Sequence, residues 1–484
     1  MHRPTRKMDR RSFLKRASAT AGGIVTASTL SLLAAHGARA QGHHRGINPS
    51  ARITRGYGPL SPAADQNGDE ILALPAGFKY VTFSKTGSLL LDGSGSVPRN
   101  HDGMTCLPHP AQPRWVRLIR NHENRNAPGD MTLAVPHAGT PYDPRGGGGT
   151  ITIDFDLETM QPVAEFVSIC GTTVNCAGGL AYRDAGWITC EETIAGPNNG
   201  FAQKHGYSFL VPVTANSATQ PIALKGLGRF AHEAAVADAR SGTVYQTEDS
   251  GNNSGLYRFV PSDPDDLTQG VLQMLAVSAN PLFEGWRSQA VGRALMCQWV
   301  EITNPDPDLE SGARSCFRQG RDQGGAAFNR LEGIFRGEGG SIYFVSTSGG
   351  EARYGQLWQY RAIGPEKGLL TLVFESPNAG VLDSPDNLCV TPSGAILFCE
   401  DDASDPDDDT HPLAPGTTNV NRLIGLSGDG MPFEFAVNRL NDAEFAGSCF
   451  SPDGNVLFVN IFGGSAANSG MTCAITGPWR SGPL

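Results

Sequence analysis

Residues that can bind metal ions recur at the same place in six segments of the chain. Five of these segments open on a carboxylic acid and one opens on a cysteine: Asp102, Cys176, Glu233, Glu332, Asp386 and Glu444. In most of them a short apolar stretch, a turn containing glycine and a β-rich stretch follow. A second polar residue closes most copies, and these residues are Glu123, Glu191, Glu248, Glu400 and Asn460. Recurrence in register favours one shared binding site over separate acids at solvated turn tips.

Side chains of this kind repel one another strongly when they meet. Two like charges 4 Å apart at an effective dielectric constant near 20 cost roughly 4 kcal/mol. A ring of carboxylates is therefore stable only when it is protonated or filled with cations. Calcium prefers an oxygen-rich site of about 6–8 ligands. The thiolate of Cys176 is a softer ligand that can hold a transition metal such as iron.

The repeat also predicts the elements that position these residues. Strand, glycine turn and strand form a hairpin. Six copies spaced about sixty residues apart predict an all-β, six-bladed β-propeller. The innermost strand of each blade faces a central channel, which the opening residues would line with metal ligands. Residues 263–323 and 405–418 are expected to be loop insertions. The 60 glycines and 33 prolines argue against a helix-dominated protein.

The first forty residues have the features of an export signal. Arg10 and Arg11 precede Phe13-Leu14-Lys15, a mild apolar stretch covers residues 21–35, and Ala38-Arg39-Ala40 has the small-x-small cleavage pattern. This arrangement resembles the twin-arginine signal. We therefore expect a signal peptide over 1–40, an N-terminal extension over 41–74 and one propeller domain over 75–484. The twin-arginine export machinery would be a partner, and the protein would be periplasmic or secreted.

Charge and hydropathy exclude several classes of function. The 484 residues carry a formal charge of −10, and the chain without its first forty residues is more acidic still. Nucleic-acid binding is not expected, because the chain has no basic stripe. Beyond the N-terminus no apolar run of about 18 residues suggests a membrane span. Acidity suits divalent cations better than anionic polymers. We expect a monomer.

The ten cysteines allow two interpretations. Disulfides are the default in an exported protein, and Cys170 is one conceivable partner for Cys176. The absence of a CxxC pair makes a structural zinc knuckle improbable. Four cysteines lie inside apolar strand-like runs and are expected to be buried as small hydrophobic residues: Cys190, Cys389, Cys399 and Cys449.

At these same positions the chain resembles the PhoX-type bacterial alkaline phosphatases. The shared motifs run in the same order over nearly all of the chain after the signal. They are Leu74–Phe78, Asn121–Glu123, Gly147–Thr150, Asn175–Gly179, Cys190–Glu192, Lys204–Tyr207, Gly228–Glu233, Thr247–Asp249, Asn329–Gly333, Ser384–Asn387, Phe450–Gly454, Phe458–Asn460 and Ile475–Trp479. One stretch, residues 180–186, departs from the family pattern and puts the pocket shape and substrate preference in question.

The resemblance implies an enzyme that hydrolyses phosphate esters with Fe³⁺ and Ca²⁺ in the propeller channel. By the same resemblance Cys176 ligates iron, Arg330 contacts the phosphate, and Trp479 lies near the site. The resemblance implies some metal ligands and leaves others plausible, and the repeat adds further ones. The full set is Cys176, Glu123, Glu191, Glu233, Glu248, Asp249, Glu332, Asp386 and Glu400.

The chemistry of such a site is metal-assisted phosphoryl transfer. His122, His205 and His232 are candidate proton donors, although each is more often a structural residue beside a turn. No serine-nucleophile motif is present. Two alternatives stay open: a calcium-dependent propeller lactonase or other esterase, and a non-catalytic scaffold clamped by metals. The lactonase or esterase would not need Cys176 or Arg330.

The signal itself can be tested. Replacing Arg10 and Arg11 together by lysine should leave the protein in the cytoplasm, because the twin-arginine pair would be lost while its charge is kept. Cell fractionation with immunodetection measures the distribution. Undisturbed export of the double variant would show that another route carries the protein.

Overall fold

The computed structural model describes residues 53–402 and 410–484, and these residues form β-strands with little helix. The expected signal peptide at 1–40 lies outside the described residues. One short α-helix, α3 (Cys316–Arg321), and several single 3₁₀ turns interrupt the strands. Within residues 53–402 and 410–484, no helix is both long enough and apolar enough to cross a lipid bilayer.

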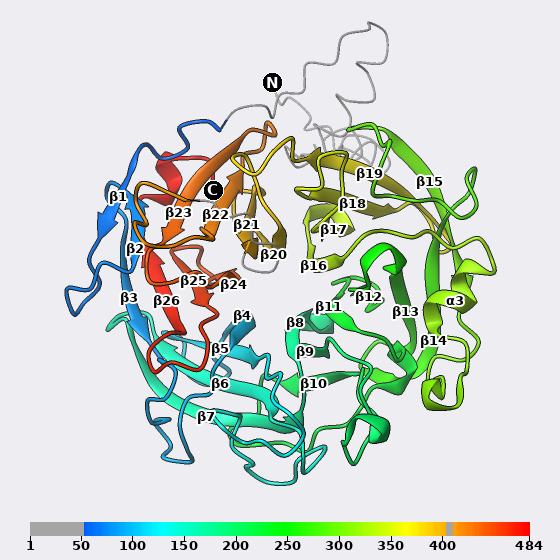
Figure 1. Ribbon diagram of the computed structural model, residues 1–484, viewed down its shortest axis with the longest axis horizontal. Helices are drawn as coiled ribbons and strands as arrows, with labels where there is room; N and C mark the ends of the chain where they lie inside the picture. Colours follow the sequence, from blue (N-terminus) through cyan, green and yellow to red (C-terminus); the bar gives the residue numbers. More distant parts are fainter. Residues whose placement is uncertain (1–52, 403–409) are drawn as a thin grey trace, which may run out of the picture.

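Antiparallel sheets stand around a common axis, with the first strand of each repeat innermost (Figure 1). Two sheets come from the first half of the described chain. Their strands are β4 (His101–Pro108), β5 (Trp115–His122), β6 (Gly148–Asp156) and β7 (Gln161–Thr172), then β8 (Asn175–Leu180), β9 (Gly186–Glu191) and β10 (Ser208–Pro212).

Two further sheets come from the C-terminal part and take in N-terminal strands. The first contains β20 (Pro385–Val390), β21 (Ile396–Glu400), β22 (Arg422–Leu426), β23 (Pro432–Asn438), β2 (Leu72–Pro75) and β1 (Leu60–Ala63). The second contains β24 (Phe445–Phe450), β25 (Val456–Ile461), β26 (Met471–Thr476) and β3 (Lys79–Phe83).

The remaining two repeats form one continuous sheet of nine strands. In order across the sheet these are β11 (His232–Ala237), β12 (Val244–Glu248), β13 (Leu256–Asp263), β14 (Asp266–Val277), β15 (Ala294–Glu301), β19 (Lys367–Glu375), β18 (Gln356–Ala362), β17 (Ser341–Ser346) and β16 (Leu331–Arg336). Its two end strands, β11 and β16, contact each other, so the sheet is nearly closed.

The fold is thus propeller-like, but the prediction of six separate blades is wrong. Four separate sheets and one nine-stranded sheet surround the axis. The cause is β15, which pairs with β14 on one side and with β19 on the other. This strand lies inside the segment 263–323, which was expected to be a loop insertion. The insertion instead supplies β14, β15 and α3.

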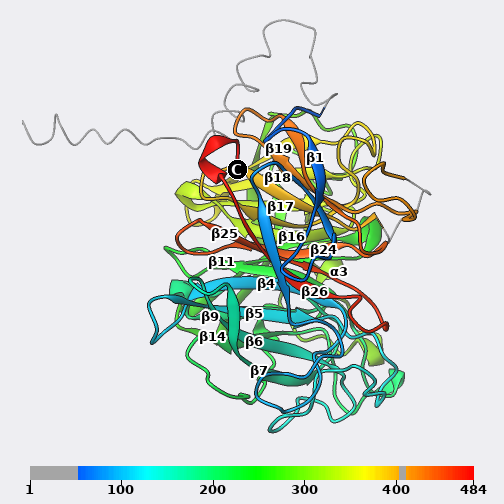
Figure 2. The same ribbon diagram turned by 90° about the vertical axis from the view of Figure 1, so that its left-hand side faces the viewer.

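The ring of innermost strands is closed. Each innermost strand contacts the next, in the order β4, β8, β11, β16, β20 and β24, and β24 contacts β4. At the outer edge β3 pairs with β26, with Val81 opposite Ala474. Figure 2 shows from the side how these N-terminal strands lie against the C-terminal ones. Residues far apart in the sequence therefore complete a single ring.

Apolar side chains fill the space between the sheets. Leu397 and Val459, for example, come from neighbouring sheets, belong to one apolar cluster and are both fully buried. All ten cysteines are buried and none is in a disulfide. Burial of the four cysteines in apolar runs is confirmed. The disulfide interpretation is wrong, because the interior of the sheets, rather than cross-links, accommodates the thiols.

Glycines allow the innermost strands to approach closely. A Cβ atom added to Gly179 in β8 would lie 1.9 Å from the carbonyl oxygen of Ala235 in β11. Contacts that short do not occur between real atoms, so a side chain there would force the two strands apart. The distance between β8 and β11 is therefore set by the missing side chain at this position.

This contact predicts the effect of a small substitution. Gly179→Ala should lower the free energy of unfolding by about 1–3 kcal/mol, because overpacking a closed interior forces the backbone to shift. Urea denaturation followed by circular dichroism measures the change. Gly364→Ala is the matched control, since a Cβ there meets nothing within 4 Å. Equal stability of the two variants would contradict the close approach.

Candidate functional site

An acidic pocket opens at the axis of the ring. Its charged and thiol-bearing lining residues are Asp102, Glu123, Arg125, Cys176, Glu192, Arg330, Glu332, Asp386, Asp401 and Glu444. Together with the buried Glu233, the acids and the thiol fall into overlapping groups whose ligand atoms lie within 4.8 Å of one another. The groups are Asp102, Glu123 and Cys176; Cys176, Glu192 and Glu233; Glu233, Glu332 and Asp386; and Asp386, Asp401 and Glu444.

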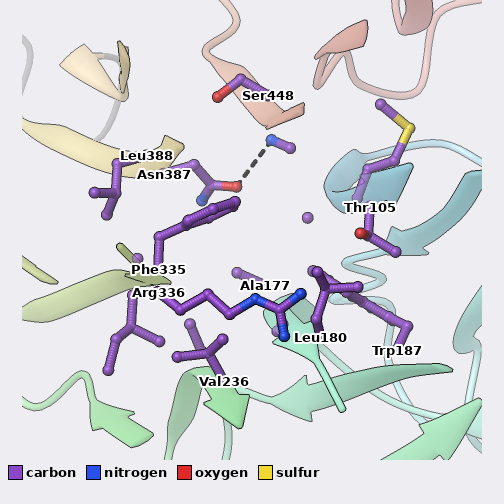
Figure 3. A pocket seen from close by; sticks show the side chains of 18 residues that line it. Thr105, Ala177, Leu180, Trp187, Val236, Phe335, Arg336, Asn387, Leu388 and Ser448 are labelled. Carbon is purple, nitrogen blue, oxygen red and sulfur yellow. Dashed lines mark hydrogen bonds between the residues drawn. The ribbon is translucent and has the colours of Figure 1, made fainter. Parts of the chain in front are cut away.

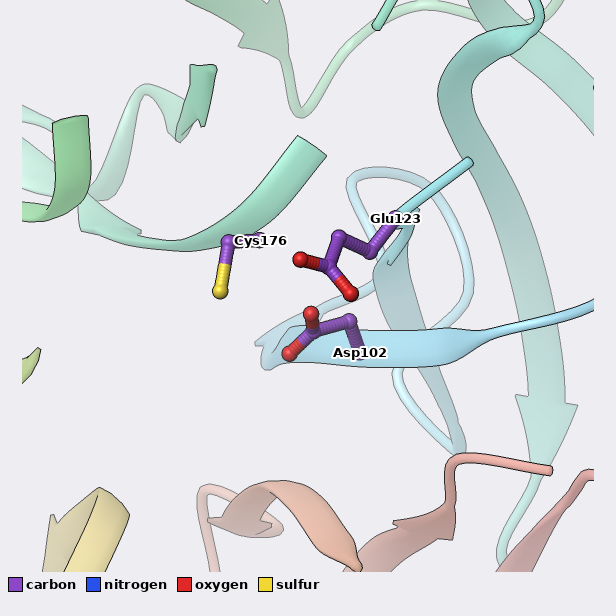
Figure 4. A group of neighbouring side chains, drawn as sticks. All are labelled: Asp102, Glu123 and Cys176. Carbon is purple, nitrogen blue, oxygen red and sulfur yellow. The ribbon is translucent and has the colours of Figure 1, made fainter. Parts of the chain in front are cut away.

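Figure 4 shows how the first of these groups is built. The sulfur of Cys176 comes from β8, the carboxylate of Asp102 from β4, and that of Glu123 from the residue after β5. Since neighbouring groups share members, the ligand atoms form one connected cluster. It contains eight carboxylates and one thiol, so it has room for more than one cation.

A β-bulge positions the opening residue in five of the innermost strands. In each of them the strand register shifts at the opening residue. The residues so placed are Asp102, Cys176, Glu233, Glu332 and Asp386. A bulge breaks the alternation of side chains and can re-aim one of them. In the sixth repeat Glu444 directly precedes β24. The opening residues predicted from the repeat are therefore brought together.

The closing residues follow a different rule. The second strands β5, β9, β12 and β21 end at His122, Glu191, Glu248 and Glu400. Of the residues that follow these strands, Glu123, Glu192 and Asp401 line the pocket, and Asp249 lies 3.5 Å from the lining residue Arg330. Successive side chains of a strand point to opposite faces. The repeat therefore named a pocket residue at Glu123, and at Glu191, Glu248 and Glu400 it named the residue just before the one at the pocket or beside it. Asp249 was named by the family resemblance.

Glu191 serves the backbone instead of the pocket. Its carboxylate accepts hydrogen bonds from the N–H groups of Thr173 at 3.0 Å, Gly206 at 2.9 Å and Tyr207 at 3.2 Å. It also lies 2.6 Å from Nδ1 of His205. These partners engage both carboxylate oxygens, and the side chain is fully buried. The structure thus places Glu191 outside the cluster, as a clamp between two loops.

Glu248 and Glu400 are also held outside the cluster. Glu248 accepts a hydrogen bond from the hydroxyl of Tyr257 at 2.6 Å, and burial raises its pKa to about 8. Glu400 forms an ion pair with Arg422 at 2.6 Å and accepts from the N–H of Asp383 at 2.8 Å. Burial raises the pKa of Glu400 to about 7. The acidic doublets 191–192 and 400–401 are the signal that could have pointed to the correct members.

Arg330 lies at the pocket, as the sequence predicts. Its guanidinium is 2.9 Å from Glu332 and 3.5 Å from Asp249. The charges of Glu332 and then Asp249 raise its pKa against the opposing effect of burial, so it is permanently cationic. Its backbone has φ of +42°. This left-handed conformation is unfavourable for a residue with a side chain, and such strain is common at functional sites.

Trp479 does not lie at the pocket. Its indole N–H donates to the carbonyl of Asn455 at 2.9 Å, and its ring packs against Phe78, Phe435 and Phe450. None of these residues lines the acidic pocket. The C-terminal turn that carries Trp479 follows β26 and lies against the outer N-terminal segment, with the hydroxyl of Tyr57 donating to its carbonyl at 2.8 Å.

The three candidate histidines are structural as well. His122 contacts the carbonyl of Arg99 through Nδ1 at 2.8 Å, and His232 contacts that of Gly228 through Nε2 at 3.0 Å. His205 is held between Glu191 and Asp143. Among the residues that the structure describes, no histidine lines the acidic pocket.

The cluster fits cations better than protons alone. Burial raises the pKa of the Asp102, Glu233 and Glu332 carboxyls, and neighbouring acids raise it further. Glu233 is fully buried, and neither of its carboxylate oxygens has a hydrogen-bond partner among the described residues. A buried carboxylate without a partner is costly. Bound cations would supply the missing partner, and the oxygen and sulfur donors suit them.

A second, mainly apolar cavity lies along the axis next to the cluster (Figure 3). It is lined by the residues that follow the ligands in the inner strands: Gly103, Ala177, Ala234, Gly333 and Asn387. Leu180 and Trp187 line it too; Leu180 is the first residue of the stretch that departs from the family pattern, and Trp187 directly follows that stretch. The departing stretch therefore adjoins this cavity and contributes no residue to the lining of the acidic pocket.

A propeller-like ring with a metal-fitting acidic pocket on its axis defines a metal-dependent enzyme. The family model for alkaline phosphatase PhoX matches residues 55–464, and the chain belongs to that family. It is a hydrolase of phosphoric esters. The resemblance noted in the sequence motifs is thereby confirmed.

The solved structure of a bacterial PhoX shows the same fold. PhoX of Pseudomonas fluorescens, in complex with the transition-state analogue vanadate, is 18% identical, with a TM-score of 0.62. The match covers 88% of this chain and 98% of that one. A gluconolactonase of Xanthomonas campestris is 10% identical, with a TM-score of 0.38 over 88% of this chain and 100% of that one. No curated protein sequence matches significantly.

Adjacent glutamates allow a direct test of the site. Glu192→Gln should lower the metal content of the purified protein by about one ion per chain, because a charged ligand of the cluster is lost. Glu191→Gln should keep the metals and lose about 1–3 kcal/mol of stability, since charge-assisted hydrogen bonds to the backbone are weakened. Elemental analysis and urea denaturation separate the two. Metal loss confined to Glu191→Gln would reverse the assignment.

Proposed function

We propose that the protein is an exported phosphatase that hydrolyses phosphate esters with iron and calcium bound in the axial pocket. The observation that carries the proposal is the single thiol of Cys176 among eight clustered carboxylates, with the arginine Arg330 on the same pocket. Oxygen ligands alone would suit calcium, whereas a thiolate favours a softer metal.

The ligand groups suggest how the ions divide. The two groups that contain Cys176 are assigned to iron, and they bring in Asp102, Glu123, Glu192 and Glu233. The two groups made of oxygen ligands alone are assigned to calcium: Glu233, Glu332 and Asp386, and Asp386, Asp401 and Glu444. Residues shared between groups would bridge ions. Asp249 is assigned to the orientation of Arg330 through their ion pair.

Bound metals would supply positive charge that polarises the phosphate oxygens and lowers the pKa of water. Arg330 would bind the transferred phosphate with its planar fork of N–H donors. Glu332 and Asp249 hold that fork on two sides, so little freedom is lost when a phosphate binds. The three histidines are assigned no proton transfer, because each is engaged away from the pocket. Trp479 is not included in the proposed site for the same reason.

Export in the folded state is supported by the cysteines. Ten buried thiols without a disulfide fit a chain that folds in the reducing cytoplasm, because oxidation during folding would pair exposed thiols. The twin-arginine pathway carries folded proteins. We therefore place the protein in the periplasm or outside the cell, with phosphate esters as substrates. The domain boundaries at 40 and 74, and the monomeric state, stay predictions.

The function is tested by elemental analysis and a p-nitrophenyl phosphate assay on one sample purified after native export. We expect iron and calcium, a coloured protein from thiolate-to-iron charge transfer, and hydrolysis. Cys176→Ser should lose iron, colour and more than about 100-fold in kcat/KM, because even outer contacts of metal sites contribute up to that much. It should keep most calcium and the fold.

Cys170→Ser is the matched control, since Cys170 is a buried thiol in β7 that donates to the carbonyl of Ala138 and does not line the pocket. Colour and activity that survive in Cys176→Ser would remove the thiolate from the site. A colourless wild-type protein that contains calcium alone and has no phosphatase activity would favour the lactonase or scaffold alternative.

A further inference from the structure

A second arginine, Arg125, stands at the mouth of the acidic pocket. Its side chain is 56% exposed, compared with 27% for that of Arg330. It therefore lies nearer to solvent than the arginine assigned to the transferred phosphate. The two arginines are the cationic residues that line the pocket in the part of the chain that the structure describes.

Arg125 is anchored by the cluster and still has donors to offer. One nitrogen, Nη2, contacts the carboxylates of both Glu123 and Glu192. Within residues 53–402 and 410–484 no hydrogen bond engages its Nε or Nη1. A guanidinium presents five N–H donors in a fixed fork. Most of that fork is therefore free to bind an anionic group from solvent.

The two anchoring acids belong to different ligand groups. Glu123 is grouped with Asp102 and Cys176, and Glu192 with Cys176 and Glu233. Each carboxylate meets Arg125 through one oxygen, which leaves the other for a cation. Once cations neutralise the cluster, the charge of Arg125 is no longer balanced by surplus acids around it. The mouth of the loaded pocket is then positive at this point.

The position of this charge points to the outer part of the substrate. A phosphate ester that enters with its phosphoryl group toward Arg330 and the cluster must keep its leaving group toward solvent. Arg125 lies on that outer side, as its greater exposure shows. We propose that Arg125 binds a second anionic group carried by the leaving group. The preferred substrates are then phosphate esters whose alcohol bears a carboxylate or a second phosphate. This inference rests on the proposed function.

A matched pair of esters isolates the second charge. 4-Carboxyphenyl phosphate and 4-carbamoylphenyl phosphate have nearly the same shape and differ in the charge of the para group. The ratio of their kcat/KM values should be roughly tenfold in favour of the carboxylate in the wild-type protein, as expected for a charge-assisted contact. In Arg125→Gln the ratio should fall to about one. Arg125→Lys should lie between the two, because it keeps the charge without the fork.

A second pair distinguishes the two kinds of anion. 1,4-Phenylene bisphosphate compared with 4-hydroxyphenyl phosphate reports a preference for a second phosphate, after correction for the two reacting groups. If the preference depends on Arg125 only in the first pair, the natural anion is a carboxylate. If it does so only in the second pair, the natural anion is a phosphate. Arg183→Gln is the control, because Arg183 is an exposed arginine that pairs with Asp265 away from the pocket. Its ratios should equal those of the wild type.

Two measurements separate this proposal from its alternatives. Elemental analysis of Arg125→Gln should show the full metal content. If the variant loses metal, or slows both esters equally, Arg125 supports the cluster or the transferred phosphate, and the proposal is wrong. Calorimetry with 4-carboxybenzylphosphonate and 4-carbamoylbenzylphosphonate, which are not hydrolysed, tests binding alone. If the metal-loaded wild type hydrolyses no ester but still prefers the carboxylate phosphonate through Arg125, the proposed function fails while the anion site stands.

Discussion

Repulsion between acids at the axis is the constraint on which the rest of the molecule depends. Eight carboxylates and a thiol converge where the innermost strands meet, and several of them are fully buried. Left uncompensated, their charge would drive the strands apart. The ring resists this with apolar packing between sheets and with strand pairing at its outer edge. Cations bound in the cluster would offset this repulsion, and their bonds to the carboxylates would then hold the ring together at its centre.

The backbone that carries these acids departs from regular strand geometry at the same position in most of the repeats. Five innermost strands carry a bulge at the ligand, and small residues follow directly in most of them. The small residues let neighbouring strands approach closely: a Cβ atom added to Gly103, which follows Asp102, would lie 2.5 Å from the Cα atom of Ala177, which follows Cys176. The ligand spacing is thus fixed by backbone contacts one residue away from the ligands. Five of the nine cluster residues are thereby held on strands, and the other four directly adjoin the end of a strand.

Much of this arrangement could be predicted from the sequence, because ligand and glycine recur together. The repeat identified Asp102, Cys176, Glu233, Glu332, Asp386 and Glu444, all of which the structure groups. At Glu191, Glu248 and Glu400 it named the last residue of a strand, which is buried away from the pocket, whereas the next residue along the chain lies at the pocket or against Arg330. Trp479, which the family resemblance placed near the site, packs instead against Phe78 and Phe435, and no repeat signals that packing. The merging of two blades also escaped it, since β15 has no counterpart in the other repeats.

The pairing of β3 with β26 has a consequence for how the protein is made. On the ribosome β3 emerges early and β26 late, so the outer edge of the ring stays open during most of synthesis. β4 likewise waits for β24 before the innermost strands form a circle. The complete ligand cluster cannot form before Glu444 and β24 have been synthesised. The ring of innermost strands must therefore close before the chain can offer its full set of ligands to a cation.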